Sequence, residues 1–220
     1  MFSNVSIELE KGKLAALVGE SGNGKSTIGQ ILQGFYKIES GTVLLNGNQD
    51  LEAVSLESYR DYIGVVPQDI HIFPGTVIDN ILLGSDVNFD RLNAFLKEYS
   101  FDQLFAKFPQ GVATILGEEG INLSGGQKQL VAFARALYKN PDLLTLDEAT
   151  AAMDRNTENF ILKILGKIKS DCAVLFISHR LHNLPKIADT IYVLENGTIQ
   201  ASGNHDQLLE SINFYSEYWL

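Results

Sequence analysis

Hydrophobic positions in this sequence fall into short runs in which nearly every residue is apolar. A strand that is covered on both faces needs apolar side chains at every position, so such runs predict buried strands of a parallel sheet. The runs are Leu14–Val18, Ile63–Val66, Leu143–Leu146, Ala173–Ile177 and Thr190–Leu194.

Three further segments have the pattern of strands and turns at the margin of such a sheet. Asn4–Glu10 alternates apolar and polar residues, which predicts a half-buried strand. Thr42–Leu45, followed by Asn46-Gly47, predicts a strand that ends in a tight turn. Glu195–Thr198 contains Asn-Gly between two strand-like runs and predicts a hairpin.

The segments between these strands have the periodicity of helices. Helices are expected near Lys25–Gly34, Asp90–Tyr99, Asp102–Phe108, Gly126–Leu137 and Arg155–Ile168, with short helices at the C-terminus. Strands that alternate with helices predict an α/β fold with a mainly parallel sheet covered on both sides. The stretch from Thr76 to Leu137 reads as a helical insertion in that fold, and no repeat or linker divides the chain.

Composition and charge narrow the functional classes. The chain has 220 residues and a net charge of −10, which argues against nucleic-acid binding but not against binding a nucleotide. No apolar run approaches the roughly 20 residues that cross a bilayer, and Met1–Asn4 does not start a signal peptide. We therefore expect an intracellular protein that reaches a membrane only through a partner. The single Cys172 is expected to be a buried, unpaired residue.

A glycine-rich loop joins the first buried run to the first helix. Its sequence, Gly19-Glu20-Ser21-Gly22-Asn23-Gly24-Lys25-Ser26, matches the phosphate-loop pattern at every defined position. Backbone N–H groups and the helix N-terminus would face phosphate oxygens, Lys25 would reach the β- and γ-phosphates, and Ser26 would ligate Mg²⁺. The alternative is a glycine-rich turn with a chance Lys-Ser, which the flanking strand and helix disfavour.

Two adjacent acids, Asp147 and Glu148, end the run that begins at Leu143. Adjacent acids often only solvate the end of a strand. Together with a phosphate loop, however, they supply a carboxylate for the Mg²⁺ shell, Asp147, and one placed where water would enter, Glu148.

Leu123-Ser124-Gly125-Gly126-Gln127, in order with the two nucleotide motifs, resembles the signature of the nucleotide-binding domain of ATP-binding-cassette (ABC) transporters. The resemblance covers nearly the whole chain. It implies a P-loop NTPase (RecA-like) core with a mainly parallel sheet, a small antiparallel β subdomain and a helical subdomain that carries the signature. The core would span about 1–68 and 138–220, and the helical subdomain about 69–137.

The same resemblance implies the residues of the site. Gln68 is similar to the glutamine loop, Met153-Asp154 to the D-loop and His179 to the switch histidine. The implied catalytic residues are Glu148, His179 and Gln68. The implied ATP contacts are Gly19, Glu20, Ser21, Gly22, Asn23, Gly24, Lys25, Ser26, Thr27, Gln68 and His179. Ser124, Gly125, Gly126, Gln127 and Asp154 would contact ATP in trans. Ser26, Gln68 and Asp147 would hold Mg²⁺.

Within this family, the chain resembles the exporters. The segments that carry this resemblance are Thr114–Gly120, Phe73–Ile81 and, for bacterial peptide or bacteriocin exporters, Gly126–Arg135. The family usually places an adenine-stacking aromatic residue in a strand upstream of the segment that matches Phe2–Leu9. This chain begins too late to contain it, and Phe2 is not at that position, so we expect that strand to be missing and base-selective binding to be weak.

The resemblance implies two partners: a second nucleotide-binding domain in a head-to-tail dimer, preferably a homodimer, and a transmembrane domain that anchors the chain at the cytoplasmic face of the cell membrane. Two other functions stay open. A soluble cassette of DNA repair, translation or cluster assembly is disfavoured because no coiled coil and no second cassette is present. A catalytically dead binding module is disfavoured because Lys25, Glu148 and His179 are intact.

Overall fold

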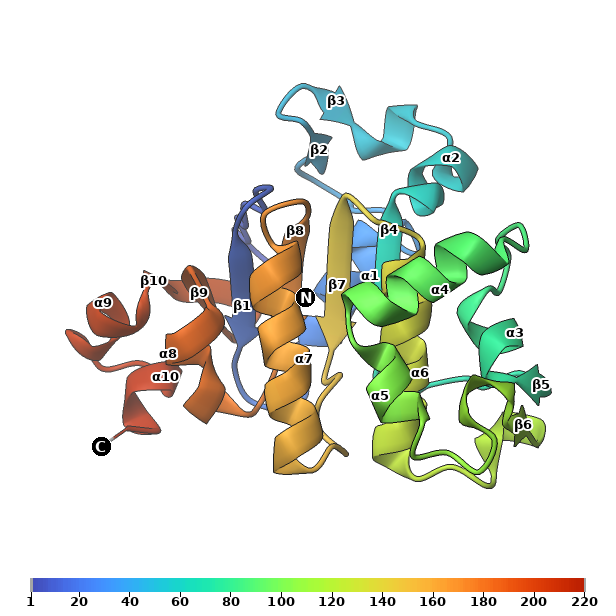
Figure 1. Cartoon of the computed structure of the whole chain (residues 1–220). Helices are drawn as coiled ribbons and strands as arrows, with labels where there is room; N and C mark the ends of the chain where they lie inside the picture. Colours follow the sequence, from blue (N-terminus) through green and yellow to red (C-terminus); the bar gives the residue numbers. More distant parts are fainter. Residues whose placement is uncertain (1, 220) are drawn as a thin grey trace.

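The computed structural model describes residues 2–219 and is organised around a six-stranded sheet in the order β10-β9-β1-β8-β7-β4 (Figure 1). All neighbours are parallel except the last hairpin, in which β10 runs antiparallel to β9. The strands are β1 (Leu14–Val18), β4 (Ile63–Val66), β7 (Leu143–Asp147), β8 (Ala173–Ile177), β9 (Thr190–Glu195) and β10 (Thr198–Gly203). The mainly parallel sheet predicted from the apolar runs is therefore confirmed.

Two small antiparallel ladders accompany this sheet. One pairs β2 (Leu44–Leu45) with β3 (Gln49–Asp50), and the other pairs β5 (Gly75–Thr76) with β6 (Ile115–Leu116). In the first, Asn46 and Gly47 both have positive φ, at 51° and 74°, as the turn predicted at that dipeptide requires.

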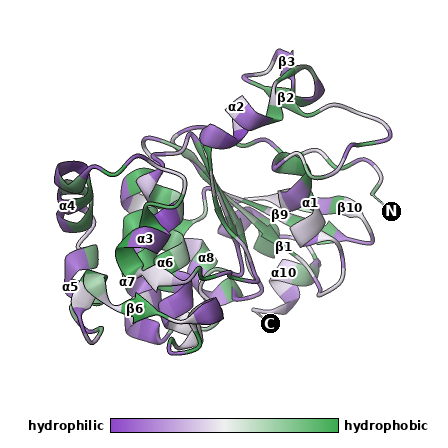
Figure 2. Cartoon of the chain, turned by 90° about the vertical axis from the view of Figure 1, so that its right-hand side faces the viewer, coloured by the Kyte–Doolittle hydropathy of each residue, from purple (hydrophilic) through white to green (hydrophobic). Residues whose placement is uncertain are grey.

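Helices cover both faces of the sheet (Figures 1 and 2). They are α1 (Lys25–Leu32), α2 (Leu56–Asp61), α3 (Val77–Ile81), α4 (Phe89–Glu98), α5 (Phe101–Phe105), α6 (Gly125–Tyr138), α7 (Arg155–Ile168), α8 (Leu184–Ile187), α9 (His205–Leu209) and α10 (Phe214–Glu217). Single 3₁₀ turns occur at Leu51–Ala53, Gly111–Ala113, Glu118–Gly120 and Leu181–Asn183. Within residues 2–219 no helix has the length and apolar character needed to cross a membrane.

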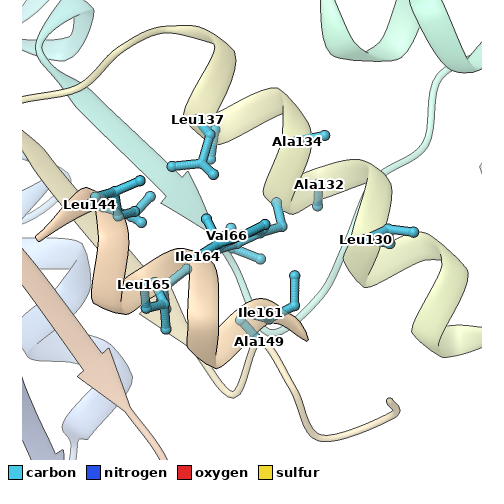
Figure 3. Packing of buried hydrophobic residues seen from close by; sticks show 14 of the residues in the cluster. Val66, Leu130, Ala132, Ala134, Leu137, Leu144, Ala149, Ile161, Ile164 and Leu165 are labelled. Carbon is cyan, nitrogen blue, oxygen red and sulfur yellow. The ribbon is translucent and has the colours of Figure 1, made fainter. Parts of the chain in front are cut away.

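Alternate residues of β1 separate the core into two layers. Leu14, Ala16 and Val18 join the large cluster that α6 and α7 complete, whereas Leu17 packs against Ile28 of α1 on the other face. In the large cluster, side chains of α6, α7 and β4 meet around Val66 (Figure 3). This double burial explains why the strands are apolar at every position.

The segment Asn4–Glu10 forms no strand, contrary to the alternation-based prediction. Val5, Ile7 and Leu9 are half-buried against the α1 face, so the alternation correctly reports which side is covered. Its backbone, however, pairs with no ladder in the described residues; the N–H of Glu8 instead donates to the Tyr192 hydroxyl at 3.2 Å. Hydrophobic alternation reports burial, and a strand also needs a partner edge.

Aromatic side chains fill the interior between α4, α5 and α6. The ring of Phe101, fully buried, lies 5.4 Å from that of Phe95, 5.8 Å from that of Phe105 and 6.2 Å from that of Phe133. Cys172, just before β8, is buried and unpaired as expected, and burial raises the pKa of its thiol to about 11.

Candidate functional site

The carboxyl ends of four neighbouring parallel strands meet at one edge of the sheet. The strands β1, β8, β7 and β4 lie side by side in that order. Each is followed by a predicted site segment: the phosphate loop after β1, Ser178-His179 after β8, Asp147-Glu148 at the end of β7, and Gln68 after β4. Parallel α/β sheets bind ligands at this edge.

Two glycines give the phosphate loop its shape. Gly19 has φ 149°, and a Cβ there would lie 2.1 Å from the Leu194 carbonyl oxygen, so no larger residue fits. Gly24, with φ 89°, is the N-cap of α1 and has no side chain to cap it. The first N–H groups of α1 are therefore left for an external acceptor, and the helix dipole favours an anion there.

The ammonium group of Lys25 lies inside this loop. The residue is 7% exposed, and its Nζ donates to the carbonyl oxygens of Gly19 at 2.9 Å and Glu20 at 2.8 Å. Burial lowers the pKa of Lys25, while Glu148 and Asp147 act in the opposite direction. A desolvated cation held on weak carbonyl acceptors gains most from an anionic ligand.

The other loop residues lie around this cation. Asn23 donates from Nδ2 to the Leu194 carbonyl at 3.4 Å, and Thr27 is half-buried on α1. Glu20, Ser21 and Gly22 are exposed at the tip. The ring of Phe2 lies against Gly24, where an added Cβ would be 2.6 Å from it.

Glu148 is the point at which the three predicted catalytic residues meet. Its Oε1 lies 3.2 Å from His179 Nδ1, and its Oε2 accepts from Gln68 Nε2 at 3.4 Å. The three residues come from the ends of three strands, and the side chains of His179 and Glu148 are 53% and 24% exposed. Water can therefore reach a carboxylate that has a hydrogen-bonding residue on either side.

Asp147 and Ser26 form a donor pair suited to Mg²⁺. Oδ1 of Asp147 is buried without a hydrogen-bond partner in the described part of the chain. Burial raises the pKa of Asp147, and the adjacent Ser26 hydroxyl acts in the opposite direction. Residues 2–219 contain no cluster of three or more His, Cys, Asp or Glu that could hold a metal alone. One carboxylate and one hydroxyl fit Mg²⁺, which takes its remaining ligands from phosphate and water. Gln68, also expected near the metal, is turned toward Glu148.

The signature segment begins α6 with two reciprocal hydrogen bonds. Ser124 Oγ accepts from the Gln127 N–H at 3.2 Å, and Gln127 Oε1 accepts from the Ser124 N–H at 2.8 Å. Between them, Gly125 and Gly126 lie so close to the loop after β7 that a Cβ on either would be 2.9 Å from Ala152. Because these two residues lack a side chain, the start of α6 can pack closely against the loop that follows Glu148.

Asp154 caps α7 rather than pointing freely outward. Its Oδ1 accepts from the N–H groups of Asn156 and Thr157 at 2.9 and 3.1 Å, and its Oδ2 accepts from the Thr157 hydroxyl at 2.7 Å. The hydrogen bond from the Thr157 side chain lowers the pKa of Asp154. The carboxylate expected to contact ATP in trans is thus engaged within its own helix.

Two side chains that the motifs did not single out also touch the loop after Glu148. Gln129 of α6 is 6% exposed and bonds to the main chain of Glu148 and of Ala152, each at 3.1 Å. Arg180 Nη2 donates to the Ala151 carbonyl at 2.6 Å. In the sequence, Gln129 could have been noticed as a polar residue on the buried side of a predicted helix, and Arg180 as an arginine directly after His179.

Comparison with known proteins is consistent with this arrangement. The sequence profile of the ABC transporter family matches residues 2–151. An ATP-dependent lipid A-core flippase of Haemophilus influenzae is 40% identical over 219 residues, which cover 99% of this chain and 37% of the flippase. A putative multidrug export ATP-binding/permease protein of Bacillus subtilis is 39% identical, covering 94% of this chain and 36% of that protein.

The solved structure of a bacterial Atm1-family ABC exporter with ATP bound is similar to this chain, with a TM-score of 0.91 at 40% identity. The match covers 99% of this chain and 38% of that chain. This chain therefore spans a little over a third of the length of the relatives that it matches. Because the family profile covers most of the chain and the strand-end motifs lie along one edge of its sheet, the chain belongs to the ABC transporter family.

Proposed function

We propose that this chain binds ATP with Mg²⁺ and hydrolyses it as the motor domain of a membrane exporter. The observation that carries the proposal is the meeting of Gln68 and His179 at the carboxylate of Glu148, along the same sheet edge as Lys25 and the uncapped start of α1. The similarity to an ATP-dependent flippase, a putative multidrug export protein and an exporter with ATP bound favours the same activity.

Each part of the site has a separate task in this proposal. The N–H groups at the start of α1 and the ammonium of Lys25 bind the phosphates, and Ser26 with Asp147 hold Mg²⁺. The metal supplies charge neutralisation at the phosphates when it is bound. Glu148 orients the attacking water and accepts its proton, and Gln68 and His179 fix the direction of the Glu148 carboxylate through their contacts at 3.4 and 3.2 Å.

The start of α6 is proposed to act on a second copy of the chain. Between the two capping hydrogen bonds of Ser124 and Gln127, Gly125 and Gly126 carry the main-chain N–H groups of a helix start, which favours an anion. In a head-to-tail homodimer these residues would contact the ATP held by the phosphate loop of the partner. Closure on ATP and opening after hydrolysis would drive a transmembrane domain at the cytoplasmic face of the membrane, with residues 69–137 as the helical subdomain beside the core.

The test of this proposal is Glu148→Gln in the full-length protein, which keeps the size of the side chain and removes the base. ATP hydrolysis should fall roughly 10²–10⁴-fold, as expected for loss of a general base. The affinity for a fluorescent ATP analogue should stay unchanged, because Lys25 and the α1 start are intact. Phosphate release measured in membrane vesicles is the assay, and wild-type turnover in Glu148→Gln would overturn the assignment.

A further inference from the structure

Gln129 is a buried polar residue on a mostly apolar helix face. It lies five positions after Ser124 on α6, next to the buried Leu130. Its amide is satisfied at both ends: Nε2 donates to the Glu148 carbonyl oxygen, and Oε1 accepts from the Ala152 N–H. A buried amide without these partners would be unfavourable, so the side chain and the loop fix one another.

Glu148 needs such support because of its backbone. Its φ is 49°, in the left-handed region that side chains other than glycine rarely adopt. A residue held there is strained, and it persists only when its surroundings define that conformation. The N–H of Glu148 donates to the Ile177 carbonyl at 3.0 Å, and its carbonyl accepts from Gln129 at 3.1 Å. Both peptide groups that flank its Cα are thereby held.

We propose that Gln129 is a positioning residue for Glu148. By holding the main chain at Glu148 and at Ala152, it orients the Glu148 carboxylate toward Gln68 and His179. The orientation of this carboxylate then depends on the position of the start of α6 in the same chain. A shift in α6 would then be transmitted to the carboxylate through one side chain. This inference rests on the proposed function, in which Glu148 activates water.

The test uses Gln129→Met in the full-length protein, because methionine has a similar volume and cannot replace either hydrogen bond. We expect kcat for ATP hydrolysis to fall about 10–100-fold, the effect of misplacing a reacting group by about 1 Å. The KM and the affinity for a fluorescent ATP analogue should change less than about threefold, since the phosphate loop is untouched. Gln103→Met, at an exposed position on α5, is the matched control and should match the wild type.

The decisive measurement combines Gln129→Met with Glu148→Gln. If Gln129 acts through Glu148, the double variant should hydrolyse ATP no more slowly than Glu148→Gln alone, because the two effects are not additive. Additive losses would overturn the inference, as would a kcat loss in Gln129→Met that merely follows its folded fraction measured by circular dichroism.

A second variant covers the case in which Gln129→Met does not fold. Gln129→Leu buries no charge and also loses both hydrogen bonds, so it should lower kcat without lowering ATP affinity. Full kcat in either variant, while Glu148→Gln is inactive, would overturn this inference and leave the proposed function standing. Wild-type hydrolysis by Glu148→Gln itself would instead overturn the proposed function.

Discussion

Two titratable side chains, Lys25 and Cys172, show how differently burial acts on single residues. Burial disfavours the charged form of each, so it lowers the pKa of Lys25 and raises that of Cys172. Lys25 faces two carbonyl oxygens and the carboxylates of Asp147 and Glu148, which keep its charged form useful for an anion. Among residues 2–219, no comparable set of polar groups favours the charged form of Cys172, and its neutral thiol packs as a small apolar group beside β8.

The thiol of Cys172 gives a prediction about pH. Its ordinary value is 9.0 and its value in the folded chain is about 11, so folding favours the protonated thiol. The stability that this preference contributes is complete below pH 9 and is lost as the pH rises through about 11. Urea unfolding between these limits should show the wild type losing stability faster with rising pH than Cys172→Ala. At pH 8, iodoacetamide should label the unfolded chain and spare the folded one; equal labelling would contradict this.

At the scale of elements, the sequence predicted β1, β4 and β8 with the bounds that the structure has. Each is buried on both faces, so its apolar run and its strand coincide. The strand predicted at Asn4–Glu10 was wrong, because hydrophobic alternation shows that one side of a segment is buried but does not reveal whether a partner strand exists.

At the site, the sequence motifs correctly placed Gln68, Glu148 and His179 at strand ends. The contacts of Gln129 and Arg180 escaped prediction because they depend on how α6 and the loop after β8 pack against residues 148–152.

Two glycines in regular elements give a matched prediction of stability. A Cβ on Gly64 of β4 would lie 2.8 Å from the Ala136 carbonyl oxygen of α6 and 2.9 Å from Pro141, whereas one on Gly166 of α7 meets nothing within 4 Å. Gly64→Ala should therefore destabilise the chain by about 1–3 kcal/mol through overpacking. Gly166→Ala should stabilise it by about 0.5–1 kcal/mol through helix propensity. Urea unfolding measures both, and a stabilised Gly64→Ala would contradict the close β4–α6 packing.

At the scale of the whole molecule, the proposed ATP site uses two helix starts that differ in charge and capping. The start of α1 has a glycine N-cap and an adjacent buried lysine, whereas the start of α6 is closed by the Ser124–Gln127 capping box. In the proposed function, the first would bind phosphate through the charge of Lys25, and the second would add hydrogen bonds and little charge. A head-to-tail pair would use one of each at every ATP, which makes the proposed dimer testable by complementation.

Two singly defective variants of the full-length protein provide that test. Lys25→Ala should abolish ATP binding at the phosphate loop, and Ser124→Arg should block the start of α6 of the same chain, so each alone should be inactive. In a head-to-tail mixed dimer both defects fall in one site and the other site is intact. Random mixing then restores roughly a quarter of the wild-type hydrolysis rate, since half of the dimers are mixed and each has one working site.

The control mixes Lys25→Ala with the double variant Lys25→Ala/Ser124→Arg, in which no phosphate loop is intact and no recovery should occur. Melting temperatures of the separate variants establish that Ser124→Arg, which removes a helix cap worth about 1 kcal/mol, still folds. Recovery in the first mixture and none in the second would require that Ser124 serves the ATP bound by Lys25 of another copy. Absence of recovery between folded, mixed variants would mean that each chain completes its own site or pairs with a different cassette.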